Sequence, residues 1–501
     1  MKKILLIVAF ALIAAVSCEK SFDVDNSGSV YGPQIAEKIE QDPAELSSYV
    51  GGLYSWLTTF AMAYTGHDDY GLLSVMMNLE YMGNDIAMDG TQNWGTYDYN
   101  HDYGQEQYIR SFQNWTCFYT LINNANAIIN FFPADYEPTD PNSRGYLGQA
   151  YALRAFAYTN LIYIFQDPVD ESGNLRTDAP TVPIVYATRD GVDADTATAS
   201  QGRNPMSVLM AHIEQNLEMA LPLLEGYVRP TKNEVDYSVA QGIAARYYLL
   251  TQQWDKAAAA AEEAMSGYTL MDKNRLYSGF MEIEDPEVMW GFNESTETQT
   301  SYASFFSHMS NECAGYTGIG QMIKCIDARL YSQIPDTDYR KGLFNTPAGD
   351  PDAVQVGGRH PYASRKFGYA DQWLQDYTYM RAAEMILIKA EAEARMGNNG
   401  PAATTLKVLM AQRDPGFGKG SVTVEDVLLQ RRIELWGEGF HYFDLRRNGL
   451  GAVRNYEGSN HPEWARKDFA PHALSFRFQI PLREIQENTE INEEDQNEWT
   501  L

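Results

Sequence analysis

The chain is poor in cysteine, with four among its 501 residues. They are Cys18, Cys117, Cys313 and Cys325, and no two form a CxxC pair, which excludes zinc fingers and redox motifs of that kind. Cys313 and Cys325 stand 12 positions apart and would close a short disulfide loop in an oxidising compartment. The alternative is that the three cysteines after Cys18 are buried free thiols, and the sequence does not decide between the two.

Basic residues are also scarce. The chain has 38 lysines and arginines against 67 aspartates and glutamates, which gives a formal net charge of −29. A protein that binds nucleic acid needs a basic face for the phosphates, so this balance excludes that class. Anionic lipid headgroups would be repelled for the same reason, so we expect any membrane contact to depend on something other than charge.

Long apolar runs are missing, with one exception near the start. Ile4–Val16 is an apolar run of 13 residues after two lysines, too short to span a bilayer and typical of a secretory signal. The run leads into Ala15–Cys18, which has the form of a bacterial lipobox, although an ordinary signal peptide with a nearby cysteine would look similar. We therefore expect a lipoprotein signal peptide at 1–17, lipid on Cys18, and a flexible tether over 18–42.

Catalytic and metal-binding motifs are absent as well. HExxH and GxSxG do not occur, and the EF-hand-like start at Asp23 has Gln34 where the bidentate glutamate belongs, so calcium has no complete ligand set. One acidic cluster lies among four arginines: Glu434, Glu438, His441 and Asp444, with Arg431, Arg432, Arg446 and Arg447. Structural ion pairs explain it more simply than the carboxylate pair of a glycosidase. We predict a protein that is not an enzyme and has no cofactor, with bound calcium left open because Asp-rich loops could hold it.

The sequence does have helical periodicity over much of its length. Apolar residues recur at helical spacing around 43–62, 105–132, 144–166, 205–224, 236–266, 378–412 and 424–439. Small or aromatic residues within 236–266 have the spacing of a tetratricopeptide repeat, in which two antiparallel helices approach closely: Ala245, Tyr248, Ala257, Ala261 and Ala264. A second set repeats this spacing: Ala390, Ala402, Leu406 and Leu409. Two ordinary alanine-rich hairpins would be the alternative.

Long stretches between these helices are rich in glycine, asparagine, aspartate and aromatic residues, chiefly 64–104, 166–204, 268–377 and 440–500. Loops of this length in a compact fold are usually functional. Aromatic rings stack on the apolar faces of sugars, and nearby amide and carboxylate groups bind the hydroxyls. The candidate ligand-binding residues are therefore Trp94, Tyr97, Tyr99, Asn100, Tyr302, Phe305 and Tyr316. In an extended strand, Tyr97 and Tyr99 would lie on one side.

Several motifs, in order along the chain, resemble those of SusD/RagB-family lipoproteins. Arg431–Arg447 is similar to the hallmark motif of that family, Tyr379–Ala392 to the helix before it, and Ile480–Asn497 to its closing segment. Trp115–Asn126 and Arg154–Leu161 resemble its N-terminal helices. The resemblance thus covers nearly the whole chain that follows the expected signal peptide.

This resemblance implies a mostly α-helical fold, with a tetratricopeptide-like scaffold of about four helix pairs and long irregular ligand-binding loops. It also implies a partner, a TonB-dependent outer-membrane transporter of the SusC type, over which the lipoprotein acts as a lid. We therefore predict a lipid-anchored protein on the cell surface, in the outer membrane, that captures glycan for import. A peptide-capturing RagB-like receptor is the alternative, and an extracellular hydrolase with a carboxylate pair is a further one. An N-terminal region at 43–235 and a C-terminal region at 236–501 would pack as one domain.

Overall fold

The computed structural model describes residues 46–64, 66–90, 94–134, 137–298, 303–317, 322–370 and 373–501. The predicted signal peptide, the predicted lipid-attachment residue Cys18 and the predicted tether lie outside these residues. Residues 48–501 form one compact unit, and the boundary predicted between 235 and 236 stays a prediction. Among the described residues, none of the helices combines the length and the apolar character that a membrane span requires.

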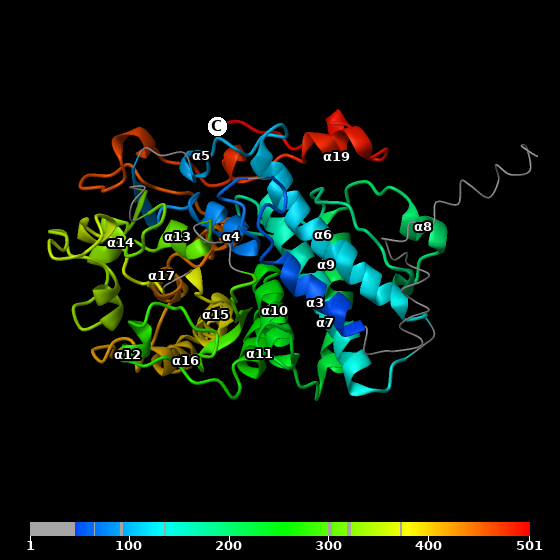
Figure 1. Cartoon of the computed structure of the whole chain (residues 1–501), viewed down its shortest axis with the longest axis horizontal. Coiled ribbons are helices and arrows are strands. Elements are labelled where there is room, and N and C mark those ends of the chain that lie inside the picture. Colours follow the sequence, from blue (N-terminus) through cyan, green and yellow to red (C-terminus); the bar gives the residue numbers. More distant parts are fainter. Residues whose placement is uncertain are drawn as a thin grey trace, which may run out of the picture. The chain divides into compact units, whose positions relative to one another are not determined.

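Long helices form the first half of the compact unit. After α3 (Leu46–Trp56) come α6 (Ile109–Phe131), α7 (Pro141–Phe165) and α9 (Met206–Leu224), and α7 packs against both α6 and α9 (Figure 1). The start of α7 is well defined because Asp140 accepts a hydrogen bond from the backbone N–H of Ser143, and Pro141 occupies the first turn. Nearly all of α7 is buried, so it is the central helix of this group.

Two helical hairpins follow along the chain. α10 (Tyr237–Leu250) packs on α11 (Trp254–Ala264), α15 (Ala382–Arg395) packs on α16 (Asn399–Met410), and α11 also contacts α15 (Figure 1). Fully buried alanines lie at these contacts: Ala257, Ala261, Ala264, Ala390 and Ala402. The predicted spacing therefore does bring helices close together, and the tetratricopeptide-like helical scaffold is confirmed.

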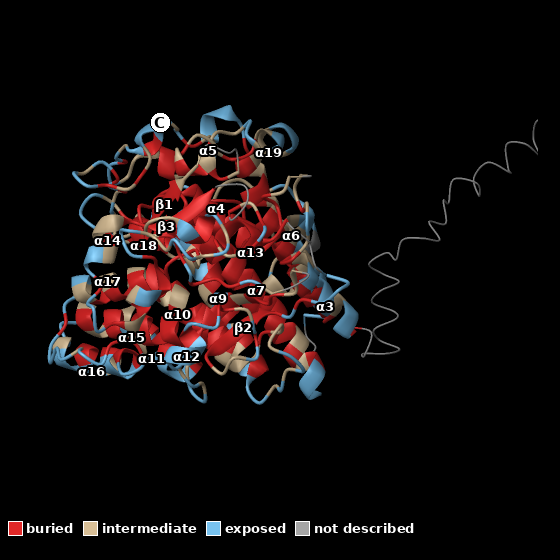
Figure 2. Ribbon diagram, turned by 60° about the vertical axis from the view of Figure 1, so that its left-hand side comes forward, coloured by how far each residue is buried: buried red, intermediate tan, exposed pale blue. Residues whose placement is uncertain are grey.

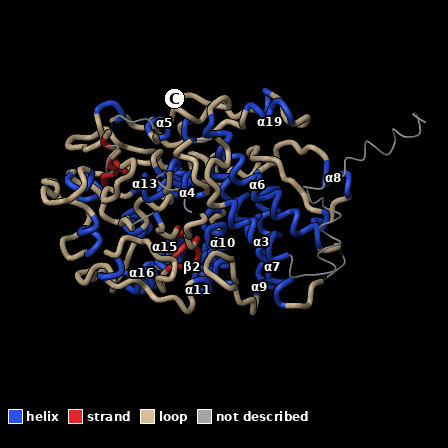
Figure 3. The backbone as a smooth tube through the Cα atoms, viewed as in Figure 1, coloured by secondary structure: helices blue, strands red, loops and turns tan. Residues whose placement is uncertain are grey.

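Shorter elements lie in the long segments between these helices. They are α4 (Leu72–Glu80), α5 (Thr96–Tyr99), α8 (Ala194–Thr198), α12 (Lys273–Leu276), α13 (Phe305–Met309), α14 (Ala328–Ser332), α17 (Val424–Glu434), α18 (His441–Arg447) and α19 (Leu482–Glu487). In the described residues the strands are short and form two antiparallel pairs, β1 (Ile86–Asp89) with β3 (Ile323–Ile326) and β2 (Val288–Phe292) with β4 (Tyr377–Arg381) (Figure 3). The mostly α-helical fold class is confirmed.

Two of the segments that differ from the sequence prediction contain β4 and α4. The helix predicted over 378–412 begins instead as strand β4, because the backbone of Tyr377–Arg381 pairs with β2 before the helix starts. The stretch 64–104, predicted to be irregular, contains α4, and every residue of α4 is buried (Figure 2). A helix that is buried on all sides has no polar face, so hydrophobic periodicity does not reveal it.

Buried ion pairs hold the hallmark motif in place. Glu434 contacts the guanidinium groups of Arg340, Arg381 and Arg413 at 3.2, 2.6 and 3.0 Å. Burial opposes the ionisation of Glu434, but these three charges outweigh it and hold its pKa well below the usual value. The rest of the motif is paired in the same way: Glu438 with Lys366 and Arg381, Asp444 with Arg431 and Arg447, and Arg446 with Asp167. The interpretation of this cluster as structural ion pairs is confirmed.

The cysteines of the described residues are not bridged. Cys117, Cys313 and Cys325 are all buried free thiols, so the loop between the last two is not closed by a disulfide. Burial raises the pKa of the Cys313 thiol to about 11, which keeps the sulfur protonated at neutral pH. Of the two alternatives that the sequence leaves open, the structure has the free thiols.

Candidate ligand-binding site

Two aromatic residues that were predicted from separate loops, Trp94 and Tyr316, meet in the structure. Their ring centroids lie 4.4 Å apart, with an interplanar angle of 50°. The ring of His67 lies 5.7 Å from each of them, and its Nδ1 atom shares a hydrogen bond with the Tyr316 hydroxyl. All three side chains are half-buried, so each keeps part of its surface in solvent. We call His67, Trp94 and Tyr316 the aromatic cluster.

The aromatic cluster rests on a buried stack of rings. The His308 ring lies 4.5 Å from the Tyr316 ring at an angle of 25°, and Tyr70 stacks on His308 at 5.4 Å. His308 also donates a hydrogen bond from Nε2 to the carbonyl oxygen of His67, at 2.9 Å. Burial, reinforced by the charge of Lys324, lowers the pKa of His308 to about 4, so this imidazole is neutral at neutral pH. The cluster therefore has an uncharged support that is fixed by packing.

The backbone at Gly95 sets the direction in which Trp94 is presented. Gly95 has a φ angle of 81°, in the left-handed region that favours glycine. A Cβ atom at this position would lie 2.6 Å from the ring of Tyr81, so a larger residue would have to displace that ring. The turn at Gly95 lets the chain pass from Trp94 directly into α5.

Arg110 of α6 joins the two segments that carry His67 and Trp94. Its guanidinium donates two hydrogen bonds to Asp98, at 2.7 and 2.8 Å, and one to Asp68, at 2.8 Å. Asp68 directly follows His67, and Asp98 lies in the short helix after Trp94. Burial opposes the ionisation of Asp68, but the Arg110 charge outweighs it and holds the pKa of Asp68 below its usual value. Charge-assisted bonds of this kind fix both segments relative to each other.

Two of the predicted ligand-binding residues are core residues instead. Tyr99 is fully buried, with the guanidinium carbon of Arg454 4.1 Å from its ring centroid. Phe305 is also buried and packs edge-on against Phe367, with 5.0 Å between the ring centroids. The prediction that Tyr97 and Tyr99 lie on one side is wrong, because residues 96–99 form a helix. Positions two apart in a helix face nearly opposite directions.

Tyr97 and Asn100 lie near the aromatic cluster in sequence but do not join it. Tyr97 is exposed and stacks on Tyr103, with 4.3 Å between the ring centroids. Asn100 is half-buried, and its Oδ1 atom has no hydrogen-bond partner among the described residues. Tyr302 lies outside the described residues. His67 was not predicted, because a single histidine in a loop forms no pattern that the sequence could reveal.

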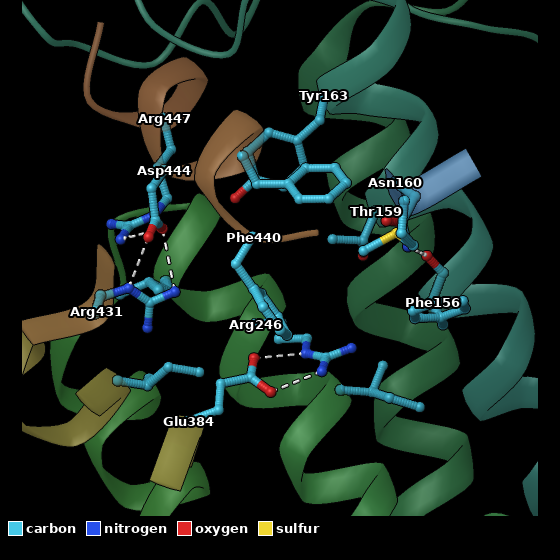
Figure 4. Close-up of a pocket in the computed structure, with 15 residues that line it drawn as sticks. Phe156, Thr159, Asn160, Tyr163, Arg246, Glu384, Arg431, Phe440, Asp444 and Arg447 are labelled. Atoms are coloured by element: carbon cyan, nitrogen blue, oxygen red, sulfur yellow. Dashed lines mark hydrogen bonds and ion pairs between the residues drawn. The ribbon is translucent and has the colours of Figure 1, made fainter. Parts of the chain in front are cut away.

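An internal cavity lies elsewhere, among the helices of the scaffold. Figure 4 shows that the pairs Arg246–Glu384 and Arg431–Asp444 face into it. Its volume of about 50 Å³ suits a few water molecules and is too small for a sugar ring. The Nη1 atom of Arg431 is buried without a hydrogen-bond partner in the described part of the chain, which is where a water molecule would bind. This cavity belongs to the ion-paired interior.

Two acidic side chains beside the aromatic cluster are engaged in ion pairs. Asp68 and Asp98 both bind Arg110, at 2.8 and 2.7 Å. A glycosidase needs one carboxyl group that holds a proton and a second that faces the scissile bond or a water molecule. The pKa values of Asp68, Glu434, Glu438 and Asp444 are all held below the usual range. Burial raises the pKa of Asp98, but both of its carboxylate oxygens are engaged by Arg110, so the geometry here suits binding.

Comparison with family models gives two matches, one in each half of the chain. The model described as the SusD family matches residues 363–499, and one described as starch-binding associating with outer membrane matches residues 58–249. The first contains the ion-paired hallmark motif, and the second contains Trp94 and His67. No curated protein matches this chain.

Solved structures share the fold over nearly their whole length. A SusD-like carbohydrate binding protein from Bacteroides vulgatus has a TM-score of 0.75 at 24% identity, covering 91% of this chain and 98% of that one. A SusD superfamily protein from Bacteroides thetaiotaomicron has a TM-score of 0.73 at 18% identity, covering 91% and 99%. Surface glycan-binding protein A from Bacteroides thetaiotaomicron, in complex with laminarihexaose, has a TM-score of 0.64 at 15% identity, covering 91% and 99%. The solved structures show the shared fold, and the two family models, one in each half of the chain, show that the chain belongs to the SusD family.

Proposed function

We propose that this protein binds glycan through the aromatic cluster of His67, Trp94 and Tyr316. The observation that carries the proposal is that two partly exposed rings, 222 positions apart in the sequence, meet on a buried and uncharged support. Rings with a free surface stack on the apolar faces of sugars. Family membership supports the proposal, as do structural neighbours named as a carbohydrate binding protein and as a surface glycan-binding protein in complex with laminarihexaose.

The protein acts, in this proposal, as a lipoprotein of the outer-membrane surface that captures glycan for a TonB-dependent transporter of the SusC type. The lipobox at Ala15–Cys18 supports the anchor, and the family description of association with the outer membrane supports the location. Cys18→Ala should move the protein from the membrane fraction to the soluble fraction. Membrane retention of that variant in cells without the transporter would contradict the lipid anchor.

Calorimetry of the mature chain with laminarihexaose and with maltohexaose tests glycan binding. We expect at least one of them to bind, and Trp94→Ala to weaken that binding by about 1–3 kcal/mol, or roughly 5- to 150-fold, with unchanged thermal unfolding. Trp464→Ala is the matched control, because Trp464 is 39% exposed and lies outside the aromatic cluster. Binding of peptides but of no glycan, across an array, would overturn the proposal in favour of the peptide receptor.

A further inference from the structure

We propose that a second aromatic surface of this protein is a glycan-contacting subsite that extends the aromatic cluster. We call it the tyrosine surface and define it by Tyr97, Tyr103, Tyr108 and Trp499, which line one hollow of about 450 Å³. This volume lies within the range of known small-ligand sites. The inference rests on the proposed function and makes it more specific, because two subsites would select long glycan chains over short ones.

The three tyrosines form a continuous row of rings. Tyr97 and Tyr103 are stacked with 4.3 Å between their centroids and an angle of 12°, and Tyr103 and Tyr108 follow at 5.2 Å and 34°. The outer two rings are the open ones, since Tyr97 is 42% exposed and Tyr108 is 38% exposed. Because each tyrosine is supported by its neighbour, the rings are already ordered and little conformational entropy is lost when a sugar binds.

The C-terminal segment brings Trp499 to this surface, and Figure 1 shows the C-terminus beside α5. The indole lies directly on Gly104, where a Cβ atom would be 2.3 Å from the indole Nε1. Asn497 fixes the segment two residues earlier, since its Nδ2 atom donates hydrogen bonds to the carbonyl oxygens of Phe165 and Phe478 at 2.7 and 2.8 Å. Trp499 is therefore held in place at the hollow.

Polar groups at the same hollow can bind sugar hydroxyls. Asp102 lines it, and the described residues donate no hydrogen bond to its carboxylate. Gln105 also lines it and accepts a hydrogen bond from Gln107 at 2.6 Å through Oε1. Its Nε2 atom donates to none of the described residues and remains available. A carboxylate acceptor and an amide donor beside open rings are the groups that a sugar ring needs.

The tyrosine surface and the aromatic cluster are close and rigidly connected. Trp94 and Tyr97 are three residues apart, so their Cα atoms lie within about 11 Å of each other. Arg110 supports both sites, because it binds Asp98 of α5 and lies 6.0 Å from the ring centroid of Tyr103. Once one part of a glycan chain is bound at the aromatic cluster, another part of the same chain can reach the tyrosine surface without a second loss of translational freedom. The second contact therefore raises the affinity for long chains.

The experiment compares short and long chains of the same sugar on the mature protein. Calorimetry would measure the Kd of laminaritriose and of laminarihexaose for the wild type and for the double variant Tyr97→Ala/Tyr108→Ala. Maltotriose and maltohexaose would be measured in the same way as a second pair. We expect the hexasaccharide Kd to rise roughly tenfold and the trisaccharide Kd to stay unchanged. Tyr97→Phe/Tyr108→Phe keeps the rings and should keep the wild-type Kd. Tyr277→Ala is the matched control, since Tyr277 is similarly exposed and lies elsewhere.

Two results would overturn this inference. An unchanged hexasaccharide Kd would mean that the tyrosine surface serves another partner, such as a protein. Equal losses for both chain lengths would mean that Tyr97 belongs to the primary site. Failure of the proposed function looks different, because the wild-type protein would then bind neither chain length of either sugar.

Discussion

The ion-paired interior around Glu434 and the aromatic cluster around Trp94 are built in opposite ways. Glu434 is buried and is compensated by three arginines, so the loss of any partner would leave a charge without compensation. Trp94 and Tyr316 are half-buried aromatic residues that are supported from beneath by buried neighbours. Substitutions in the interior should therefore affect folding, whereas substitutions in the cluster should affect binding and leave the fold intact.

The largest effect is expected for Arg381→Met. Arg381 is 1% exposed and contacts Glu287, Glu434 and Glu438 at 2.6–2.7 Å. Its removal leaves buried carboxylates under-compensated, so we expect the free energy of unfolding to fall by about 3–5 kcal/mol in urea denaturation.

The matched control for this prediction is Arg483→Met. Arg483 pairs with Glu487 on the surface of α19 and is 66% exposed, so its loss should change stability by less than about 0.5 kcal/mol. Equal stability changes for Arg381→Met and Arg483→Met would contradict the structural role of the buried pairs.

A smaller loss of stability is expected from overpacking the helical repeat. Ala257 and Ala261 are fully buried where α11 meets its neighbours, so Ala257→Leu or Ala261→Leu should each destabilise the fold by about 1–3 kcal/mol in thermal unfolding. Ala259→Leu, on the exposed face of the same helix, should have little effect. If the buried and the exposed substitutions lowered thermal stability equally little, the prediction of a close helix contact at Ala257 and Ala261 would be contradicted.

A further prediction concerns the pH dependence of stability, which should depend on Lys324, a buried lysine that has no carboxylate partner in the described part of the chain. Burial lowers the pKa of Lys324 from 10.5 to about 7. Between about pH 7 and pH 10.5 the unfolded chain therefore binds more protons than the folded one, and stability should rise with pH across this window. Lys324→Met should flatten that rise, which urea denaturation at several pH values would measure. An unaltered slope in the variant would mean that Lys324 is not the group responsible.

Much of the scaffold could be predicted because its signals are local. The alanine spacing at Ala257 and Ala261 marks a close helix contact, and the arginines around Glu434 indicate ion pairs; both interpretations hold in the structure. Strand β4 was missed because its pairing with β2 is long-range and its sequence continues into a helix. Helix α4 was missed because it is buried on every side.

The candidate site could be predicted only in part. Trp94 and Tyr316 were identified from ring and polar neighbours, but their meeting depends on the tertiary fold and not on any spacing in the sequence. Tyr99 was misassigned because a strand was expected where α5 forms, and this reverses the direction of its side chain. The sequence does not indicate His67 as a site residue; its assignment to the site depends on its position beside both rings in the structure.

A double-mutant cycle on glycan affinity tests most directly the central claim, that Trp94 and Tyr316 form one binding site. The measurement is the Kd of wild type, Trp94→Ala, Tyr316→Ala and the double variant for laminarihexaose or maltohexaose, whichever wild type binds, with thermal unfolding as the check on folding. Because the two rings are in contact, we predict that each single variant weakens binding and that the losses are non-additive by about 0.5–3 kcal/mol. Strictly additive losses, or wild-type affinity in either single variant, would contradict a shared site.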